Sequence, residues 1–201
     1  MKYILLALLT MIFIGCSTKV PVVTKYKINI PSHSIQTEIS SNSKCKKQSL
    51  KVLQSFSSSI LMSSEMHYVL DANKIYPYSA AGWASTPNRS ISDEYFMMLR
   101  DLKFFNAVQS AKSRTKASWL LEIKVEDFMQ YYEKDNTKSF AKVSIDLTLL
   151  NANGSDVIAS RNFHSKVNTR SLDAQGGVIA LDNALADVLS QSALWISEEC
   201  K

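Results

Sequence analysis

The sequence predicts an α+β fold in a single domain, in which an antiparallel or mixed β-sheet is covered by two helices. The first observation is the stretch 118–167, where apolar and polar residues alternate in three long runs, as in strands that bury one face. The second is the stretch from about Asp173 to just before Cys200, where apolar residues recur every three or four positions. Because three strands with one apolar face need a cover, we expect this long C-terminal helix to pack across the sheet.

Residues 1–15 have the build of a secretory signal peptide. Lys2 supplies a positive start, and the apolar run 4–14 is shorter than the roughly 20 residues that span a bilayer. The run ends in Phe13-Ile14-Gly15-Cys16, which resembles the lipobox of bacterial lipoproteins, with Phe13 in place of the usual leucine. The resemblance implies cleavage before Cys16, a diacylglycerol on its thiol and an acyl chain such as palmitate on its amine. An ordinary signal, or an uncleaved anchor with Cys16 incidental, is the alternative.

Residues 16–44 are expected to form the acylated N-terminus and a flexible tether, because they are rich in Ser, Thr and Lys and hold two prolines. Within this stretch Tyr26, Ile28 and Ile30 alternate with polar residues, which is typical of a short edge strand. Ser17 stands where enteric inner-membrane lipoproteins carry aspartate. By that resemblance we expect an anchor at the periplasmic face of the outer membrane rather than at the inner membrane.

The domain itself is expected over residues 45–201. Cys45 and Cys200 lie near its two ends, and an even pair of cysteines in an oxidising compartment predicts a disulfide. Such a bond would join the start of the domain to its last helix. Two free thiols are the alternative.

Short strands are expected in the first part of the domain. Leu50, Val52 and Phe56 recur with period two and predict one strand. The runs 66–70 and 74–78 flank a turn at 71–73 and predict a hairpin.

The stretch 76–87 is interpreted as an aromatic connection punctuated by prolines. Tyr76, Tyr78 and Trp83 are its large side chains, and aromatic anchors on loops often carry binding, so we predict that they contact a partner or a lipid. The alternative is that these three side chains seal the edge of the core.

A helix follows the connection. Ser90 and Asp93 form a variant of the capping box, which predicts a helix from Ser90 to about Lys103, and 104–108 then reads as a short strand. In the β-rich stretch that comes next, a polar loop at 133–138 and the turn Asn153-Gly154 separate the three long strands.

The C-terminal helix has two distinct sides. Its apolar side is made by Val178, Leu181, Leu185, Val188 and Trp195. Its polar side is made by Asp182, Asn183, Asp187 and Gln191. We expect the first side to meet the sheet and the second to face away from it.

Catalytic and cofactor signatures do not emerge from the sequence. The five glycines form no phosphate-binding loop, the three histidines are scattered, and no Gly-x-Ser-x-Gly occurs. We therefore expect no catalytic residue, no metal, no cofactor and no enzymatic activity. Glu122 and Glu126 share a strand face and are interpreted either as paired carboxylates or as an ordinary solvated face.

The formal net charge is +5, and part of it lies in two small basic clusters. They consist of Lys44, Lys46 and Lys47, and of Lys112, Arg114 and Lys116. These clusters could meet anionic headgroups or an acidic partner, or they could be solvated loops. Nucleic acid is not an expected partner, because the signal peptide directs the chain away from it.

The order of these features resembles the ABC-type transport auxiliary lipoproteins, a family that includes the paraquat-inducible Pqi lipoprotein of enteric bacteria. The likeness covers roughly residues 45–197. It is carried by the lipobox, the period-two strand, Ile75-Tyr76-Pro77-Tyr78, Trp83-Ala84 with Pro87, the capped helix, Phe105-Asn106-Ala107-Val108, Leu120 to Phe128 and the long C-terminal helix.

The resemblance implies a periplasmic lipoprotein that works with ABC transporter subunits and a protein carrying a mammalian-cell-entry (MCE) domain. Such systems move phospholipid or other apolar molecules across the envelope, so the chain would act as a docking subunit at the outer membrane. Phospholipid is a further candidate ligand, and a homo-oligomer is a candidate assembly. The alternative is an assembly or structural envelope lipoprotein of the pilotin or cell-wall synthase activator type.

Overall fold

The centre of the fold is an antiparallel run of three long strands, as the alternation predicts. The computed structural model describes residues 22–30, 43–71, 73–153 and 156–201. Within them β7 (Trp119–Tyr132) pairs with β8 (Ser139–Asn151), which pairs with β9 (Val157–Asn168). Leu121, Ile123 and Ile145 are fully buried on the shared apolar face. The expected α+β class is therefore confirmed.

Short strands extend the sheet beyond β7 and make it mixed. Those that run parallel to β7 are β2 (Ser49–Val52), β3 (Phe56–Ser57) and β4 (Glu65–Leu70). Beyond them lie β5 (Lys74–Trp83), β1 (Thr24–Tyr26) and β6 (Ala107–Gln109). β5 is antiparallel to β4, while β1 runs parallel to β5 and β6 runs parallel to β2. In the described part of the chain the sheet has nine strands.

The long C-terminal helix α3 (Ala174–Glu199) packs on the sheet as predicted. Asp173 precedes the helix, and its side chain caps it by accepting a hydrogen bond of 2.8 Å from the Gly176 N–H. Leu185 and Val188 are completely buried against the strands. A fully buried side chain of this kind contributes about 1.5–3 kcal/mol, so the apolar stripe of α3 is a main source of stability.

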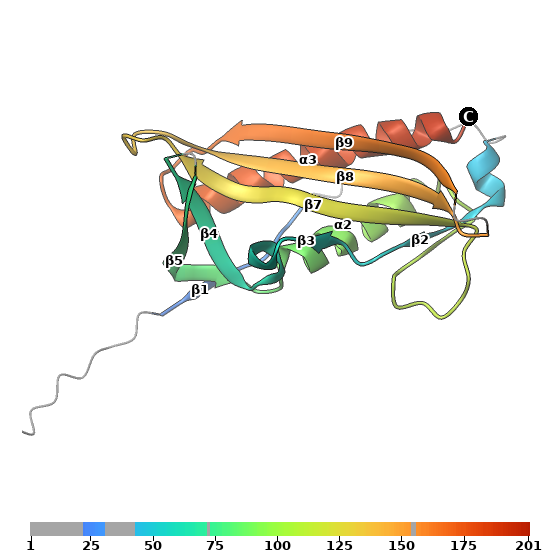
Figure 1. The fold of residues 1–201 in the computed structure, drawn as a ribbon, viewed down its shortest axis with the longest axis horizontal. Helices are drawn as coiled ribbons and strands as arrows, with labels where there is room; N and C mark the ends of the chain where they lie inside the picture. Colours follow the sequence, from blue (N-terminus) through green and yellow to red (C-terminus); the bar gives the residue numbers. More distant parts are fainter. Residues whose placement is uncertain (1–21, 31–42, 72, 154–155) are drawn as a thin grey trace, which may run out of the picture.

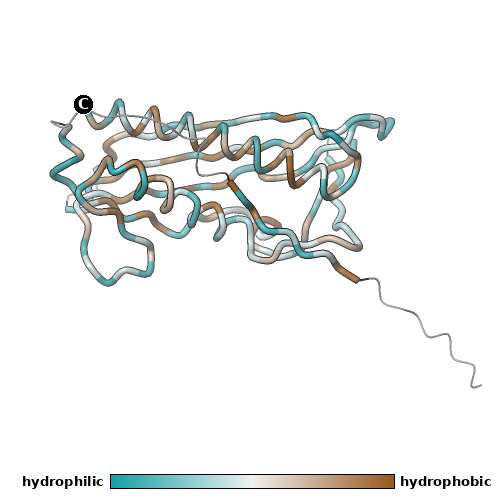
Figure 2. Tube along the Cα trace, turned by 180° about the vertical axis from the view of Figure 1, so that it is seen from behind, coloured by the Kyte–Doolittle hydropathy of each residue, from teal (hydrophilic) through white to brown (hydrophobic). Residues whose placement is uncertain are grey.

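The second helix, α2 (Pro87–Leu102), lies on the same face of the sheet as α3 (Figures 1 and 2). It starts three residues before the expected Ser90, so the predicted capping box is wrong. Pro87 occupies the first turn, where its fixed φ suits a helix. A backbone N–H at this position has no hydrogen-bond partner within the helix, so the missing N–H of proline costs nothing there. The hydroxyls of Tyr95 on α2 and Ser192 on α3 lie 3.0 Å apart and tie the two helices together.

Two of the expected short strands differ from the prediction. The strand through Leu50, Val52 and Phe56 is divided into β2 and β3, because the chain between them turns to α2, where the Ser55 N–H donates to the Ser92 hydroxyl at 2.7 Å. Phe56 is consequently exposed rather than buried. The strand expected over 104–108 begins only at Ala107.

The aromatic stretch 76–87 is mostly a strand rather than a loop. β5 continues from Lys74 through Pro77 to Trp83. Pro77 is tolerated because β1 joins β5 only at Ala81–Trp83, so β5 has a partner on one side at the proline. The two prolines that bracket this stretch therefore mark an edge of the sheet and the start of α2.

The two ends of the elongated domain differ in what they hold (Figure 1). β1, the hairpin of β4 and β5, and the loop 133–138 lie toward one end. The short 3-10 helix η2 (Lys44–Lys47) and the C-terminus lie at the other. The packed region also includes residues N-terminal to 45, because Ile28 is buried in the core. The edge strand expected through Tyr26, Ile28 and Ile30 is only partly present, since β1 ends at Tyr26.

Cys45 and Cys200 are joined by a disulfide at the C-terminal end of the domain. Both residues are fully buried. The Ser43 hydroxyl and the Lys44 N–H both donate to the Cys200 carbonyl, at 3.0 and 3.1 Å. The start of η2 is therefore held against the end of α3 by hydrogen bonds as well as by the disulfide.

Candidate functional site

Four tyrosines gather at the end of the domain where the hairpin of β4 and β5 lies. We call them the tyrosine cluster, and they are Tyr68 on β4, Tyr76 and Tyr78 on β5, and Tyr132 on β7. The ring of Tyr68 is central, with centroids 4.7 to 5.8 Å from those of the other three. Residues far apart in the sequence meet here because β4 lies between β5 and β7 in the sheet.

A buried amide fixes the tyrosine cluster to the sheet. The Tyr78 hydroxyl donates to Gln130 Oε1 at 2.7 Å, and Gln130 Nε2 donates to the Ser139 hydroxyl at 2.9 Å. The Tyr132 hydroxyl donates to the Leu172 carbonyl at 3.1 Å, just before α3. Burial, followed by the hydrogen bond with Tyr132, raises the pKa of Tyr78 above its ordinary value. Both hydroxyls are therefore neutral donors that hold the cluster in place.

The tyrosine cluster borders a shallow cavity of about 410 Å³. Pro77 and Leu172 line it together with the rings of Tyr68, Tyr78 and Tyr132. Its walls are partly apolar, and the hydroxyls of Tyr78 and Tyr132 are already engaged within the protein. This arrangement suits contact with an apolar or amphipathic partner better than acid–base chemistry.

The structure separates the three aromatic residues that the sequence singles out. Tyr76 and Tyr78 belong to the tyrosine cluster, and Tyr76 is 42% exposed. Trp83 is only 4% exposed and its ring packs 5.6 Å from that of Phe128, so it belongs to the core. Sealing of the core is thus the correct interpretation for Trp83.

Tyr68 and Tyr132 are members of the cluster that sequence reasoning did not identify as functional. Tyr68 appears in the sequence as one position of an alternating strand, and Tyr132 as the last residue before a polar loop. The parallel pairing of β4 with β7 places Tyr68 opposite Gln130 and Leu70 opposite Tyr132. Because this pairing joins segments some 60 residues apart, no local pattern could reveal it.

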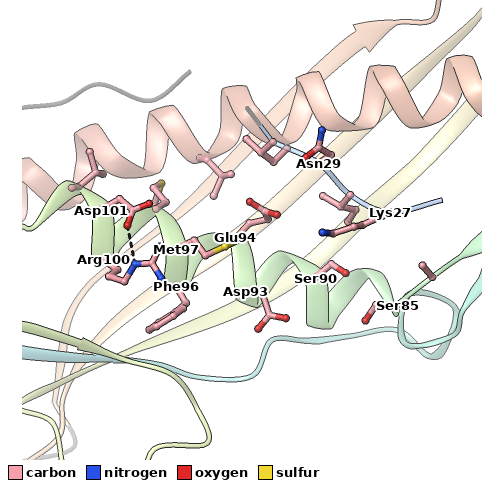
Figure 3. Close-up of a pocket in the computed structure, with 16 residues that line it drawn as sticks. Lys27, Asn29, Ser85, Ser90, Asp93, Glu94, Phe96, Met97, Arg100 and Asp101 are labelled. Atoms are coloured by element: carbon pink, nitrogen blue, oxygen red, sulfur yellow. Dashed lines mark hydrogen bonds and ion pairs between the residues drawn. The ribbon is translucent and has the colours of Figure 1, made fainter. Parts of the chain in front are cut away.

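A second hollow of about 900 Å³ lies between residues Lys27–Ile30 and the helices α2 and α3 (Figure 3). Lys27 and Glu94 face each other across it, and the Asn29 N–H donates to Asp182 Oδ1 at 3.3 Å. Burial raises the pKa of Asp182 to about 7, although the Asn29 hydrogen bond opposes the rise. Burial also raises the pKa of Glu94, while the charge of Lys27 lowers it.

Asp182 lies on the predicted polar side of α3 but is less exposed than that position suggests. Its neighbour Asn183 is exposed, but Asp182 is half-buried because residues 27–30 lie over this part of α3. The helical period alone places Asp182 on the polar side, and only the N-terminal segment covers it.

Glu126, one of the two candidate carboxylates, makes structural contacts. Glu126 accepts from Lys124 Nζ at 3.0 Å and Asn162 Nδ2 at 3.0 Å, and the Lys124 hydrogen bond lowers its pKa. In the described part of the chain no group of three or more His, Cys, Asp and Glu side chains could hold a metal ion. Over the same residues no helix is long and apolar enough to cross a membrane. Cys16 lies outside the described residues.

The two basic clusters both lie toward the end of the domain that carries the disulfide (Figure 1). Lys46 Nζ donates to the carbonyl of Lys103 at the end of α2. Lys51 Nζ donates to the carbonyls of Ser113 and Thr115 and so holds the loop that bears the second cluster. Two basic segments that are at least 65 residues apart in the sequence thus lie toward the same end of the domain.

Comparison with known proteins gives one family. The model of a family described as the ABC-type transport auxiliary lipoprotein component matches residues 32–193. Among curated proteins none matches this sequence.

Solved structures share the fold. A protein from Xanthomonas campestris is 20% identical, with a TM-score of 0.75 over 88% of this chain and 96% of that one. A second, uncharacterised protein is 15% identical, with a TM-score of 0.66 over 87% of this chain and 99% of that one. A hypothetical protein from Chlamydia trachomatis is 8% identical, with a TM-score of 0.52 over 77% and 98% of the two chains. At these identities the likeness concerns the fold alone.

Proposed function

Because this chain belongs to the family of ABC-type transport auxiliary lipoprotein components, we propose that it is a lipid-anchored docking subunit of a transport system that moves lipid or other apolar molecules across the envelope. The family match over residues 32–193 is the observation that carries the proposal. The other components would be ABC transporter subunits and a protein with an MCE domain. The chain would bind these partners and catalyse no reaction.

The anchor would be Cys16, carrying a diacylglycerol and an N-acyl chain such as palmitate. Each buried methylene adds about 0.8 kcal/mol, so two or three acyl chains hold a protein durably in a bilayer. Cys16 precedes Val22 by six positions, and an extended chain of that length reaches about 20 Å. The domain would therefore stay close to the membrane that holds its anchor, which we propose to be the periplasmic face of the outer membrane.

The shape of the domain suits a docking role. The 26 residues of α3 span about 39 Å along the long strands. One end of the domain carries the tyrosine cluster, and the other carries both basic clusters. A subunit with two such different ends can contact the membrane and a partner protein at the same time.

A deletion strain complemented with either the wild-type chain or the Cys16→Ser variant would test the proposal. We expect the wild-type chain to incorporate labelled palmitate, to sediment with outer-membrane markers in a sucrose gradient and to restore detergent resistance. The Cys16→Ser variant should do none of these, although it should be produced at a comparable level. An unchanged barrier in the deletion strain would contradict the transport function, and palmitate incorporation by Cys16→Ser would contradict the anchor.

A further inference from the structure

Exposed apolar side chains lie beside the tyrosine cluster, at the end of the domain where the hairpin of β4 and β5 lies (Figure 1). They are Ile75 and Tyr76 on β5 and Leu172 just before α3, while Val22 and Val23 are the exposed apolar residues that precede β1. Val22 is 88% exposed and Leu172 is 48% exposed, although both are apolar. We call this surface the tyrosine end, because the tyrosine cluster forms its floor. Apolar side chains grouped in this way mark a surface that contacts something other than water.

Cationic side chains surround the same end. Lys134, Lys138 and Arg170 are exposed, and none has an ion pair within 4 Å among the described residues. Acidic side chains lie beside them, because Glu133 is exposed in the same loop, Asp135 accepts from the Thr137 N–H and Asp173 caps α3. This end therefore carries exposed charges of both signs, and the three cations can approach anionic headgroups without first breaking an ion pair among the described residues.

Tyrosine, aliphatic and basic side chains on one surface are the combination found where proteins meet the boundary between lipid headgroups and acyl chains. Aromatic rings suit that boundary because one part is apolar and the hydroxyl is polar. Basic side chains are attracted to anionic headgroups. The composition of the tyrosine end thus fits a bilayer surface.

The start of the described chain supports the same partner. The described chain begins at Val22, two residues before β1, which lies on the same side of the domain as β4 and β5 and runs along β5 (Figure 1). With Cys16 only six positions before Val22, an acyl anchor would keep this end within about 20 Å of the bilayer. The disulfide end lies at the far side of the domain, beyond the length of the long strands.

We propose that the tyrosine end rests on the bilayer that holds the anchor, with Ile75, Tyr76 and Leu172 at the headgroup–acyl boundary. The long strands then point away from the membrane, and the basic clusters at the disulfide end face the partner protein. This inference rests on the proposed anchor at Cys16, and it adds the surface of contact and the orientation of the domain.

The test uses the full lipidated chain in liposomes of phosphatidylethanolamine and phosphatidylglycerol. With Cys16 acylated and Cys45 bonded to Cys200, an introduced cysteine is the free thiol and takes a nitroxide label. The variants are Ile75→Cys and Leu172→Cys. Leu194→Cys is the matched control, because it is a leucine of similar exposure near the other end of α3.

Power-saturation electron paramagnetic resonance then compares the access of oxygen and of a water-soluble nickel complex to each label. We expect labels at positions 75 and 172 to lose nickel access and gain oxygen access when the protein enters liposomes, while the label at 194 stays open to nickel. Labels at 75 and 172 that remain open to nickel in floated liposomes would overturn the orientation and leave the anchor standing. Protein that fails to float with the liposomes would overturn the anchor and, with it, this inference.

Discussion

Removal of the disulfide tests how the two ends of the chain are held together. The bond joins Cys45 to Cys200 and closes a loop of 155 residues. In the chain-entropy treatment such a loop lowers the entropy of the unfolded state by an amount worth about 5 kcal/mol, and removal of native disulfides from small secreted domains costs about 2–5 kcal/mol. We therefore expect the Cys45→Ala/Cys200→Ala variant to lose about 3–5 kcal/mol of unfolding free energy.

The variant should nevertheless fold. The core of β7, β8 and α3 does not depend on the bond, and the hydrogen bonds from Ser43 and Lys44 to the Cys200 carbonyl remain. Since about 1 kcal/mol corresponds to 2–4 °C in a domain of this size, the Tm should fall by roughly 10 °C.

Urea unfolding without reductant, followed by tryptophan fluorescence, measures the change. The m value should rise in the variant, because an unfolded chain without the cross-link is more expanded. Wild-type protein unfolded with reductant is the control and should match the variant. A loss below about 1 kcal/mol with an unchanged m value would refute the reasoning, because the bond would then constrain little of the unfolded chain.

Three further substitutions follow from the contacts. Gly177→Ala would place its Cβ on the buried amide of Gln130, so it should cost about 1–3 kcal/mol in urea unfolding. Tyr78→Phe should cost about 1–2 kcal/mol, because it removes the hydroxyl that donates to Gln130 Oε1. Asp182 has a pKa raised to about 7, so the folded protein holds a proton that the unfolded chain releases near pH 4, and stability should fall as pH rises from about 4 to 7. Asp182→Asn should flatten this slope and, because Asp182 is partly open to solvent screening, gain only about 1–2 kcal/mol at pH 8.

Each substitution has an outcome that would contradict its reasoning. If Gly177→Ala stabilises the protein, the higher helix propensity of alanine, worth about 1 kcal/mol, outweighs any steric clash with Gln130, and the predicted clash is contradicted. Tyr76 is exposed, so Tyr76→Phe is the control. If it lowers the unfolding free energy as much as Tyr78→Phe does, the hydrogen bond from Tyr78 to Gln130 does not explain the loss. Equal pH slopes for wild type and Asp182→Asn between pH 4 and 8 would show that other groups cause the dependence.

The sequence predicts the elements whose own residues carry a long period. β7, β8 and β9 alternate over 12 to 14 residues, and α3 keeps its apolar stripe over 26. In both cases the burial of one apolar face contributes most of the stabilising free energy. The spacing of the apolar residues along the sequence therefore shows which face is buried.

The short strands and the candidate site depend instead on contacts between distant segments. β2 and β3 have two to four residues each, and their pairing with β7 decides where they begin and end. Trp83 looked like a loop residue because prolines flank it, but its ring enters the core beside Phe128. The polarity of Asp182 is visible in the sequence, whereas its burial under residues 27–30 is not.

A cross-linked pull-down of the tagged, lipidated protein from whole envelopes tests the central claim most directly, with the partners identified by mass spectrometry. The account predicts an MCE-domain protein and ABC transporter subunits, and it predicts that charge reversal of Lys44, Lys46 and Lys47 at the disulfide end weakens their recovery. The Cys16→Ser variant should lose these partners. Recovery of a secretin or a cell-wall synthase in place of a transporter would contradict the account.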